Sequence, residues 1–307
     1  MPSFSVAKST NASFSPSYVP IAVITGATSG IGAAIARALA THLHGRIHLV
    51  LVGRNKAAAD ALIASLPAPP SSARHAQYEF VACDLTLMAN AHALARDLAA
   101  RLPKINFLVH CAGVFGLLGR VETEEGIDVK LATRYYARFA LTHGLLKPLQ
   151  QAASVHQPAS VLSVLGAGLG AKIDMQDLGM KNNYSGVRAM TQSICYNDLM
   201  VAGFAERYPE VSFTHIYPGA VDTGMFIFSN PILRALKFLL QPLLDLMLVE
   251  PHICAEYMLY ALLDANKGMN RRNQTGDDIG RTGFPDVSEE ARKVFWEHCL
   301  KDTLTEE

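Results

Sequence analysis

The sequence predicts an α/β fold in which one doubly wound, Rossmann-like parallel sheet carries helices on both of its faces. Three observations lead to this prediction. Short apolar runs of strand length alternate with segments of helical periodicity from Ile21 to about Leu263. The runs are apolar on both faces, as in parallel strands that helices cover on each side. A glycine-rich turn separates the first apolar run from the first helical segment.

The alternation gives the following elements in order. The predicted strands occupy Ile21–Thr25, Ile47–Val52, Tyr78–Ala82, Phe107–His110, Val161–Leu165 and Val211–Tyr217. The predicted helices occupy Ile31–Thr41, Lys56–Ser65, Met88–Arg101, Gly126–Leu149, Ser185–Tyr208, Pro251–Asp264 and Val287–Leu300. Because no linker interrupts this pattern, we predict a single domain over residues 20–307, preceded by a flexible polar leader at residues 1–19.

Composition excludes several classes of protein. Half of the 307 residues are hydrophobic and 18% are charged. This hydrophobic fraction is large enough to form a large core and is higher than in disordered chains. The 27 basic and 27 acidic residues balance, so no basic field is available for binding nucleic acid. The five cysteines include no C-x-x-C pair, and the first twenty residues lack the apolar run of a signal peptide. We therefore expect a cytoplasmic protein.

The glycine-rich turn predicts a nucleotide site. Gly26 lets the chain turn away from the first strand, Gly30 allows a backbone to approach a pyrophosphate closely, and Gly32 lets helix and strand pack together. Ser29 and Ile31 complete the start of the helix, where free N–H groups and the positive end of the helix dipole favour an anion. A glycine-rich turn without a ligand is the simpler alternative.

The residue after the second strand indicates which dinucleotide binds. Arg54 stands twenty-two residues beyond Gly32, where a site for NAD places an acidic residue on the ribose 2′-hydroxyl. A guanidinium group suits a 2′-phosphate instead, so we predict NADP(H) as the cofactor. The alternative is that Arg54 and Lys56 are a solvated helix start.

Further motifs follow in the same order along the chain. Cys83-Asp84-Leu85 ends the third strand, His110-Cys111-Ala112-Gly113 ends the fourth, and Tyr217-Pro218-Gly219-Ala220-Val221-Asp222-Thr223 follows the sixth. Together with the glycine turn, they resemble the short-chain dehydrogenase/reductase family from Pro20 to Leu263, and the departures described below resemble fungal specialised-metabolite members. The resemblance implies that the nucleotide site also includes Asp84, Cys111, Gly113, Val221 and Thr223.

The catalytic positions depart from this family. Its serine, tyrosine and lysine positions fall on Gly166, Met190 and Ile194, and its asparagine position falls on Arg134. A tyrosine lets such enzymes exchange a proton while the nicotinamide exchanges a hydride with a carbonyl carbon. The thioether of Met190 and the alkyl group of Ile194 can neither donate a proton nor bind the ribose hydroxyls, as the family's tyrosine and lysine do. We therefore predict an atypical proton donor.

Two candidates can replace the missing groups. Tyr184 and Arg188 stand four residues apart on one helical face, where the guanidinium group could stabilise a phenolate. Alternatively, Tyr184 anchors a loop. Arg134 could hold a carbonyl, enolate or carboxylate oxygen in the pocket, or it could pair with a nearby acid.

The expected function is an NADP(H)-dependent oxidoreductase of secondary metabolism that acts on a carbonyl or alcohol of a bulky apolar small molecule. The apolar substrate is inferred from residues 224–250, whose composition predicts a lid over the pocket; polar residues within Ile232–Leu248 argue against a membrane span. Alternatives are a non-redox cyclase, isomerase or dehydratase of this fold, and a catalytically silent nucleotide-binding partner. No metal site is predicted, and the resemblance implies a tendency to form homodimers through the two long helices near Arg134 and Ser193.

Overall fold

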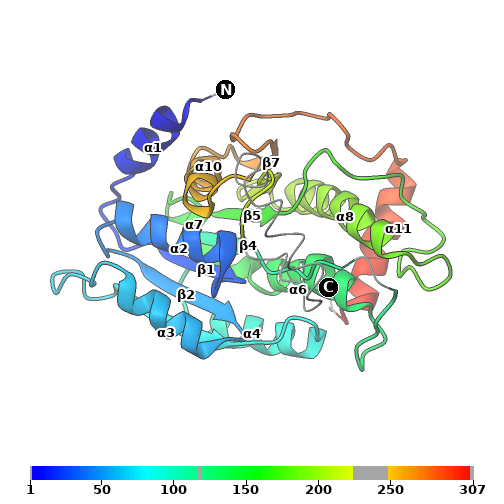
Figure 1. The fold of residues 1–307 in the computed structure, drawn as a ribbon, viewed down its shortest axis with the longest axis horizontal. Helices are drawn as coiled ribbons and strands as arrows, with labels where there is room; N and C mark the ends of the chain where they lie inside the picture. Colours follow the sequence, from blue (N-terminus) through cyan, green and yellow to red (C-terminus); the bar gives the residue numbers. More distant parts are fainter. Residues whose placement is uncertain (1, 117–118, 224–247, 305–307) are drawn as a thin grey trace, which may run out of the picture.

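The computed structural model describes residues 2–116, 119–223 and 248–304. Its centre is a seven-stranded sheet in the order β3-β2-β1-β4-β5-β6-β7, in which every pair of neighbouring strands is parallel (Figure 1). The strands are β1 (Ile21–Thr25), β2 (His48–Gly53), β3 (Gln77–Ala82), β4 (Phe107–His110), β5 (Ser160–Val164), β6 (Ser212–Ile216) and β7 (Gly268–Arg272). The predicted fold class is confirmed. Most of the expected lid, residues 224–247, lies outside the described residues.

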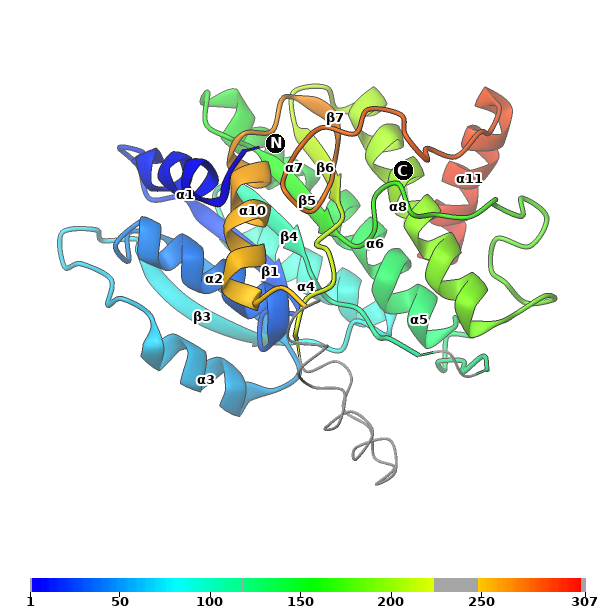
Figure 2. The ribbon, with the colours of Figure 1, turned by 45° about the horizontal axis from the view of Figure 1, so that its top comes forward.

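Helices cover both faces of this sheet, and each face has its own apolar core (Figure 2). One face carries α2 (Gly30–His42), α3 (Lys56–Ser65) and α10 (Pro251–Leu263). The other carries α4 (Met88–Arg101), α6 (Ala137–Gly144), α7 (Leu146–Ser154) and α8 (Gly186–Arg207). β1 and β5 are buried along their whole length, as expected of strands that are apolar on both faces. No helix of the described ranges is both long and apolar enough to span a bilayer.

The helix predicted over Gly126–Leu149 is wrong as a single element. It divides into α5 (Val129–Leu131), the π-helix η1 (Ala132–Tyr136), α6 and α7. A π-turn inserts one extra residue into a helical turn and is frequent at functional sites. The irregular turn includes Arg134, which is buried.

The prediction of a flexible leader is also wrong. Residues Phe4–Ser13 form helix α1, which lies beside α10 at the edge of the molecule (Figures 1 and 2). Ser3 caps its first turn by accepting a hydrogen bond from the Val6 N–H. Asn11 is fully buried and donates to the backbone carbonyl and the carboxylate of Glu256, each at 2.8 Å. Contacts with a distant part of the chain therefore order a segment whose own composition does not require a helix.

Helix α11 (Glu289–Asp302) packs on the outside of α8 and η1 (Figure 2). Phe295 lies 5.7 Å from Tyr135 and Trp296 lies 4.9 Å from Phe204, measured between ring centroids. These aromatic contacts cover part of the outer surface of α8 and η1. A homodimer stays a prediction.

Candidate functional site

A cavity of about 420 Å³ lies at the carboxyl ends of β1, β2 and β4. The sheet order reverses between β1 and β4, and ligands of open parallel sheets bind at such a switch point. The side chains and backbone that line the cavity come from Gly26, Thr28, Ser29, Gly30, Ile31, Gly32, Gly53, Arg54, Cys83, Asp84, Leu85, Cys111, Ala112, Gly113, Val114, Thr133 and Thr223. Ten of the eleven residues predicted to bind the nucleotide are therefore together, and Val221 is the exception.

The floor of this cavity has room only for glycine at two positions. Gly26 has a φ of +69°, and a Cβ atom there would lie 2.6 Å from the backbone nitrogen of Ala112. A Cβ atom on Gly32 would collide with the carbonyl of Gly26. The turn thus brings the end of β1, the start of α2 and the end of β4 into contact, and it leaves an open backbone cradle.

The start of α2 is free to bind an anion. Ser29 is the N-cap residue, but its side chain makes no capping hydrogen bond, and the first turn contains no acidic residue. The first N–H groups of the helix therefore have no capping side chain and lie in the wall of the cavity. A pyrophosphate fits this donor set and the backbone cradle.

Arg54 and Asp84 line the same cavity from the ends of β2 and β3. Arg54 is exposed, and it forms no hydrogen bond or ion pair among the residues that the structure describes. Lys56, by contrast, pairs with Asp60 on the surface at 2.7 Å. Lys56 is therefore a solvated side chain at the start of α3, as in the alternative interpretation. Arg54 is available to a ligand.

Thr223 and Cys111 line the cavity, whereas Val221 does not. Thr223 lines the cavity and its Cβ lies 3.1 Å from the place of a Cβ atom on Gly30. Val221 is buried and bridges to Val249 instead. Burial raises the pKa of the Cys111 thiol to about 12, so this residue lines the site as a neutral thiol.

Gly166 and Ile194, which the alignment places at the family's serine and lysine positions, are in contact. A Cβ atom on Gly166 would lie 2.8 Å from Cδ1 of Ile194, so the isoleucine side chain covers the glycine. This contact places the two residues together in space. Their alignment to the family's serine and lysine stays a prediction. Met190 contributes its backbone carbonyl to the site, as an acceptor for Arg134 and for the Ser193 hydroxyl.

The structure does not bring Tyr184 and Arg188 together as a catalytic pair. The Tyr184 oxygen accepts a hydrogen bond from the Lys130 ammonium group at 2.9 Å, and Tyr184 is not among the residues that line the cavity. Burial, and secondly the charge of Asp128, raise the pKa of the Tyr184 phenol. Arg188 is directed to the carbonyl of Asn183 and lies 3.6 Å from Asp174. These contacts match the alternative in which Tyr184 anchors the loop before α8.

Arg134 lies directly behind the cavity wall. Its Cγ would be 3.5 Å from a Cβ atom on Gly113, a residue that lines the cavity. Nε donates to the Ser193 hydroxyl at 3.0 Å, and Nη2 donates to the Met190 carbonyl at 3.4 Å. Within the described ranges it forms no ion pair, so the alternative of a nearby acidic partner is not observed.

Comparison with known proteins identifies the family. The profile of the short chain dehydrogenase family matches residues 20–168. Oxidoreductase AN1596 of Emericella nidulans is 33% identical over 247 residues, which cover 80% of this chain and 72% of that protein. The chain belongs to the short-chain dehydrogenase family. Polyprenol dehydrogenase of Mus musculus is 31% identical over 226 residues, covering 71% of this chain and 64% of that protein.

A solved structure agrees with this assignment. The 3-oxoacyl (acyl-carrier-protein) reductase of Agrobacterium tumefaciens with NADP bound has a TM-score of 0.60 and 18% identity, over 84% of this chain and 94% of that one. The similarity shows that the fold is shared. The protein is thus an oxidoreductase of the short-chain dehydrogenase type, built to use a nicotinamide cofactor.

The sequence did not reveal every polar residue around the site of this short-chain dehydrogenase. Arg138 donates to the Ser163 hydroxyl at 2.7 Å and to the Ala112 carbonyl at 2.8 Å. Ser163 in turn donates to Asn197 at 2.6 Å. The spacing of Arg134 and Arg138, four residues apart in an apolar helix, was the available signal, because such residues share a helical face.

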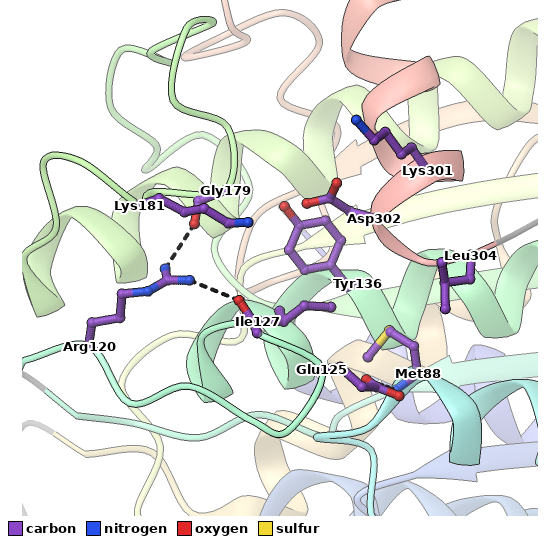
Figure 3. Close-up of a pocket in the computed structure, with 11 residues that line it drawn as sticks. Met88, Arg120, Glu125, Ile127, Tyr136, Gly179, Lys181, Lys301, Asp302 and Leu304 are labelled. Atoms are coloured by element: carbon purple, nitrogen blue, oxygen red, sulfur yellow. Dashed lines mark hydrogen bonds between the residues drawn. The ribbon is translucent and has the colours of Figure 1, made fainter.

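A second cavity, of about 250 Å³, lies between α11, η1 and the segment around Glu125 (Figure 3). The Arg120 guanidinium group bounds it by donating to the carbonyls of Gly179 and Gly126, at 2.9 and 3.1 Å. The Tyr136 hydroxyl inside it is hydrogen-bonded to Nε2 of His298 at 2.7 Å. This cavity shares no residue with the nucleotide cavity and contains none of the predicted site residues.

Proposed function

We propose that this short-chain dehydrogenase is an NADP(H)-dependent oxidoreductase that acts on a carbonyl or alcohol of a bulky apolar small molecule, through a proton donor other than the family's tyrosine. The observation that carries the proposal is the cavity at the switch point of the sheet. It combines an uncapped helix start, a glycine cradle and the unpaired Arg54 guanidinium group. These features suit a pyrophosphate and an additional phosphate.

Each group in the cavity has a separate part in binding. The α2 N-terminus would hold the pyrophosphate, Arg54 the 2′-phosphate, and Asp84 the adenine end. When bound, the cofactor supplies the hydride transfer. The chain's own residues then need to orient the substrate carbonyl and provide for its proton.

Arg134 is the group that we assign to an oxygen atom of the substrate. Burial lowers the pKa of its guanidinium group only to about 10, so it stays charged at neutral pH and polarises an oxygen without giving up its proton. The reduced oxygen then takes its proton from a water molecule, and the hydroxide that remains is protonated by bulk solvent. We assign no chemical step to Tyr184 and Arg188, because the phenol is engaged by Lys130 and the guanidinium group by Asp174 and Asn183.

Several features support an apolar substrate in secondary metabolism. Gly166, Met190 and Ile194 are apolar at the positions that the alignment gives to the family's polar catalytic groups, and the Ile194 side chain covers Gly166. One relative is a fungal oxidoreductase, and another is named for a polyprenol. All five cysteines are free, which agrees with a cytoplasmic location, although that location stays a prediction.

Titration calorimetry with NADPH and NADH tests the cofactor. We expect NADPH to bind more tightly, and Arg54→Met to weaken NADPH binding by about 10- to 100-fold, the value of one charge-assisted contact of ~1.5–3 kcal/mol. NADH binding should stay within about twofold, since it lacks the 2′-phosphate. Arg96→Met is the matched control, because Arg96 is an exposed arginine of α4 outside the cavity. No uptake of either cofactor would overturn the proposal.

Absorbance of the nicotinamide band during incubation with apolar ketones and enones tests the reaction. Oxidation of NADPH supports the proposed oxidoreductase. The hydrocarbon at Gly166, Met190 and Ile194 favours one second candidate, a non-redox enzyme of the same fold that polarises its substrate with Arg134. That enzyme would convert substrate while NADPH stays unconsumed, and this outcome would replace the first proposal.

A further inference from the structure

Two arginines on successive helical turns are buried behind the wall of the nucleotide cavity. Arg134 in η1 is 8% exposed and Arg138 in α6 is 2% exposed. Arg134 donates to a hydroxyl and a backbone carbonyl, as described above. Arg138 donates to the Ser163 hydroxyl and to the carbonyls of Val164 and Ala112, and its Nε has no hydrogen-bond partner.

All of these acceptors are uncharged. Within residues 2–116, 119–223 and 248–304, neither guanidinium group forms an ion pair. Burial lowers the pKa of Arg138 to about 9, and the charge of Arg134 contributes to this shift. Both groups nevertheless stay protonated at neutral pH, so two positive charges lie in the protein interior, and no carboxylate of the described residues forms an ion pair with them.

Arg134 and Arg138 lie next to the nucleotide cavity. Nη2 of Arg138 binds the carbonyl of Ala112, and both Ala112 and Gly113 line the nucleotide cavity. Because Gly113 has no side chain and is exposed, nothing from this residue covers Arg134 on the cavity side. The Nη1 atom of Arg134 also makes no hydrogen bond to any described residue.

We propose that Arg134, with the charge of Arg138 behind it, binds a carboxylate of the substrate, so that the apolar substrate is an acid. The inference rests on the proposed function, because it takes this cavity as the place of reaction. A carboxylate would provide the negative charge that no residue of 2–116, 119–223 or 248–304 supplies to the pair, and a guanidinium group matches its planar geometry. Arg138 is a positioning residue, since its donors are already used by Ser163, Val164 and Ala112.

Calorimetry with decanoate and decanamide, which share the same alkyl chain and have a charged and a neutral head group, tests this proposal in the presence of saturating NADP⁺. We expect decanoate to bind at least about tenfold more tightly than decanamide, as one charge-assisted contact provides. Arg134→Met should abolish this preference, whereas Arg134→Lys should keep part of it. Arg188→Met is the matched control, because Arg188 already pairs with Asp174, and it should change neither affinity.

Two outcomes would overturn the inference. Equal binding of decanoate and decanamide would show that the pair selects no acid. Competition between decanoate and NADPH in the absence of NADP⁺ would show that the cofactor's phosphates are the missing anion. Failure to bind NADPH at all would overturn the proposed function instead, so the two failures are distinguishable. A thermal unfolding curve for each variant shows whether that variant folds. If Arg134→Met does not fold, the preference of Arg134→Lys for decanoate over decanamide decides the result.

Discussion

This short-chain dehydrogenase buries arginine side chains in two regions, and the regions differ in whether a carboxylate pairs with the charge. Arg271 of β7 is fully buried, and it binds both oxygens of Asp198, at 2.8 and 2.9 Å. Arg134 and Arg138 are also buried but have only neutral acceptors among the described residues. A charge that is paired within the chain serves the fold, whereas a charge that is left unpaired beside a cavity is available to a ligand.

The paired region also shapes the site. Nδ1 of His215 is 2.6 Å from the Asp198 carboxylate, and its Nε2 accepts the backbone N–H of Gly166 at 3.2 Å. Asp198 thus connects α8, β6 and β7 to the corner where the family's catalytic serine would stand. The compensated arginine holds this corner, and Arg134 and Arg138 lie behind the wall of the cavity.

Removing the shared carboxylate should have the largest effect. Asp198→Ala leaves a buried guanidinium group and a buried histidine without their partner, and breaking such a pair costs about 3–5 kcal/mol. We expect the free energy of unfolding in urea to fall by this amount. Asp174→Ala is the control: its pair with Arg188 is about one-third exposed, so the loss should be below ~1 kcal/mol. Equal losses in the two variants would remove the distinction between the regions.

Restoring the family's catalytic pair should have the next largest effect. If the alignment is correct, Met190→Tyr combined with Ile194→Lys should raise NADPH-dependent reduction of apolar ketones by about 100-fold, the lower value for general acid catalysis. The lysine also adds a third cation to the helices that carry Arg134 and Arg138 or contact them, so stability should fall. Tyr184→Phe made in the same background should change the rate little, and a large loss would return the proton transfer to Tyr184.

Substitution of the uncompensated arginine should hardly change stability. Arg134→Met replaces a buried charge that lacks an ionic partner with a side chain of similar length, and such replacements are often neutral or stabilising. We expect a change of less than about 1 kcal/mol in urea unfolding, in contrast to the loss at Asp198. A loss of several kcal/mol would mean that the hydrogen bonds to Ser193 and Met190 are structural, and the comparison would fail.

The smallest effect should be a pH dependence of the paired region. Burial alone would raise the pKa of Asp198, but the charges and hydrogen bonds of His215 and Arg271 outweigh burial and lower it. The resulting stability is complete above the unfolded value, about 3.9, and is lost as the pH falls through the lower folded value. Urea unfolding between pH 7 and 3 should show this acid loss in the wild type and less of it in Asp198→Asn. Identical slopes would contradict the assignment.

Local pattern was enough to predict most of the sheet and several helices. β1, β4, α3 and α4 begin and end at the predicted residues, because each is a continuous apolar run or an amphipathic segment between clear turn signals. β7 was missed, since Gly268–Arg272 contains little apolar sequence and lies at the edge of the sheet. α1 was missed because its order depends on the contact of Asn11 with Glu256, far away in the chain.

The sequence by itself determined the class of fold and the glycine turn that forms the floor of the cavity, because these follow from residue types at short spacings. The absence of the family's tyrosine, serine and lysine stays a prediction from the alignment. Only the tertiary structure decided which charges are paired. Arg271 finds Asp198 seventy-three residues away, Lys130 and not Arg188 reaches Tyr184, and Arg134 finds no acid among the described residues. Ion pairing depends on distances of a few ångströms between remote segments, and no local pattern contains those distances.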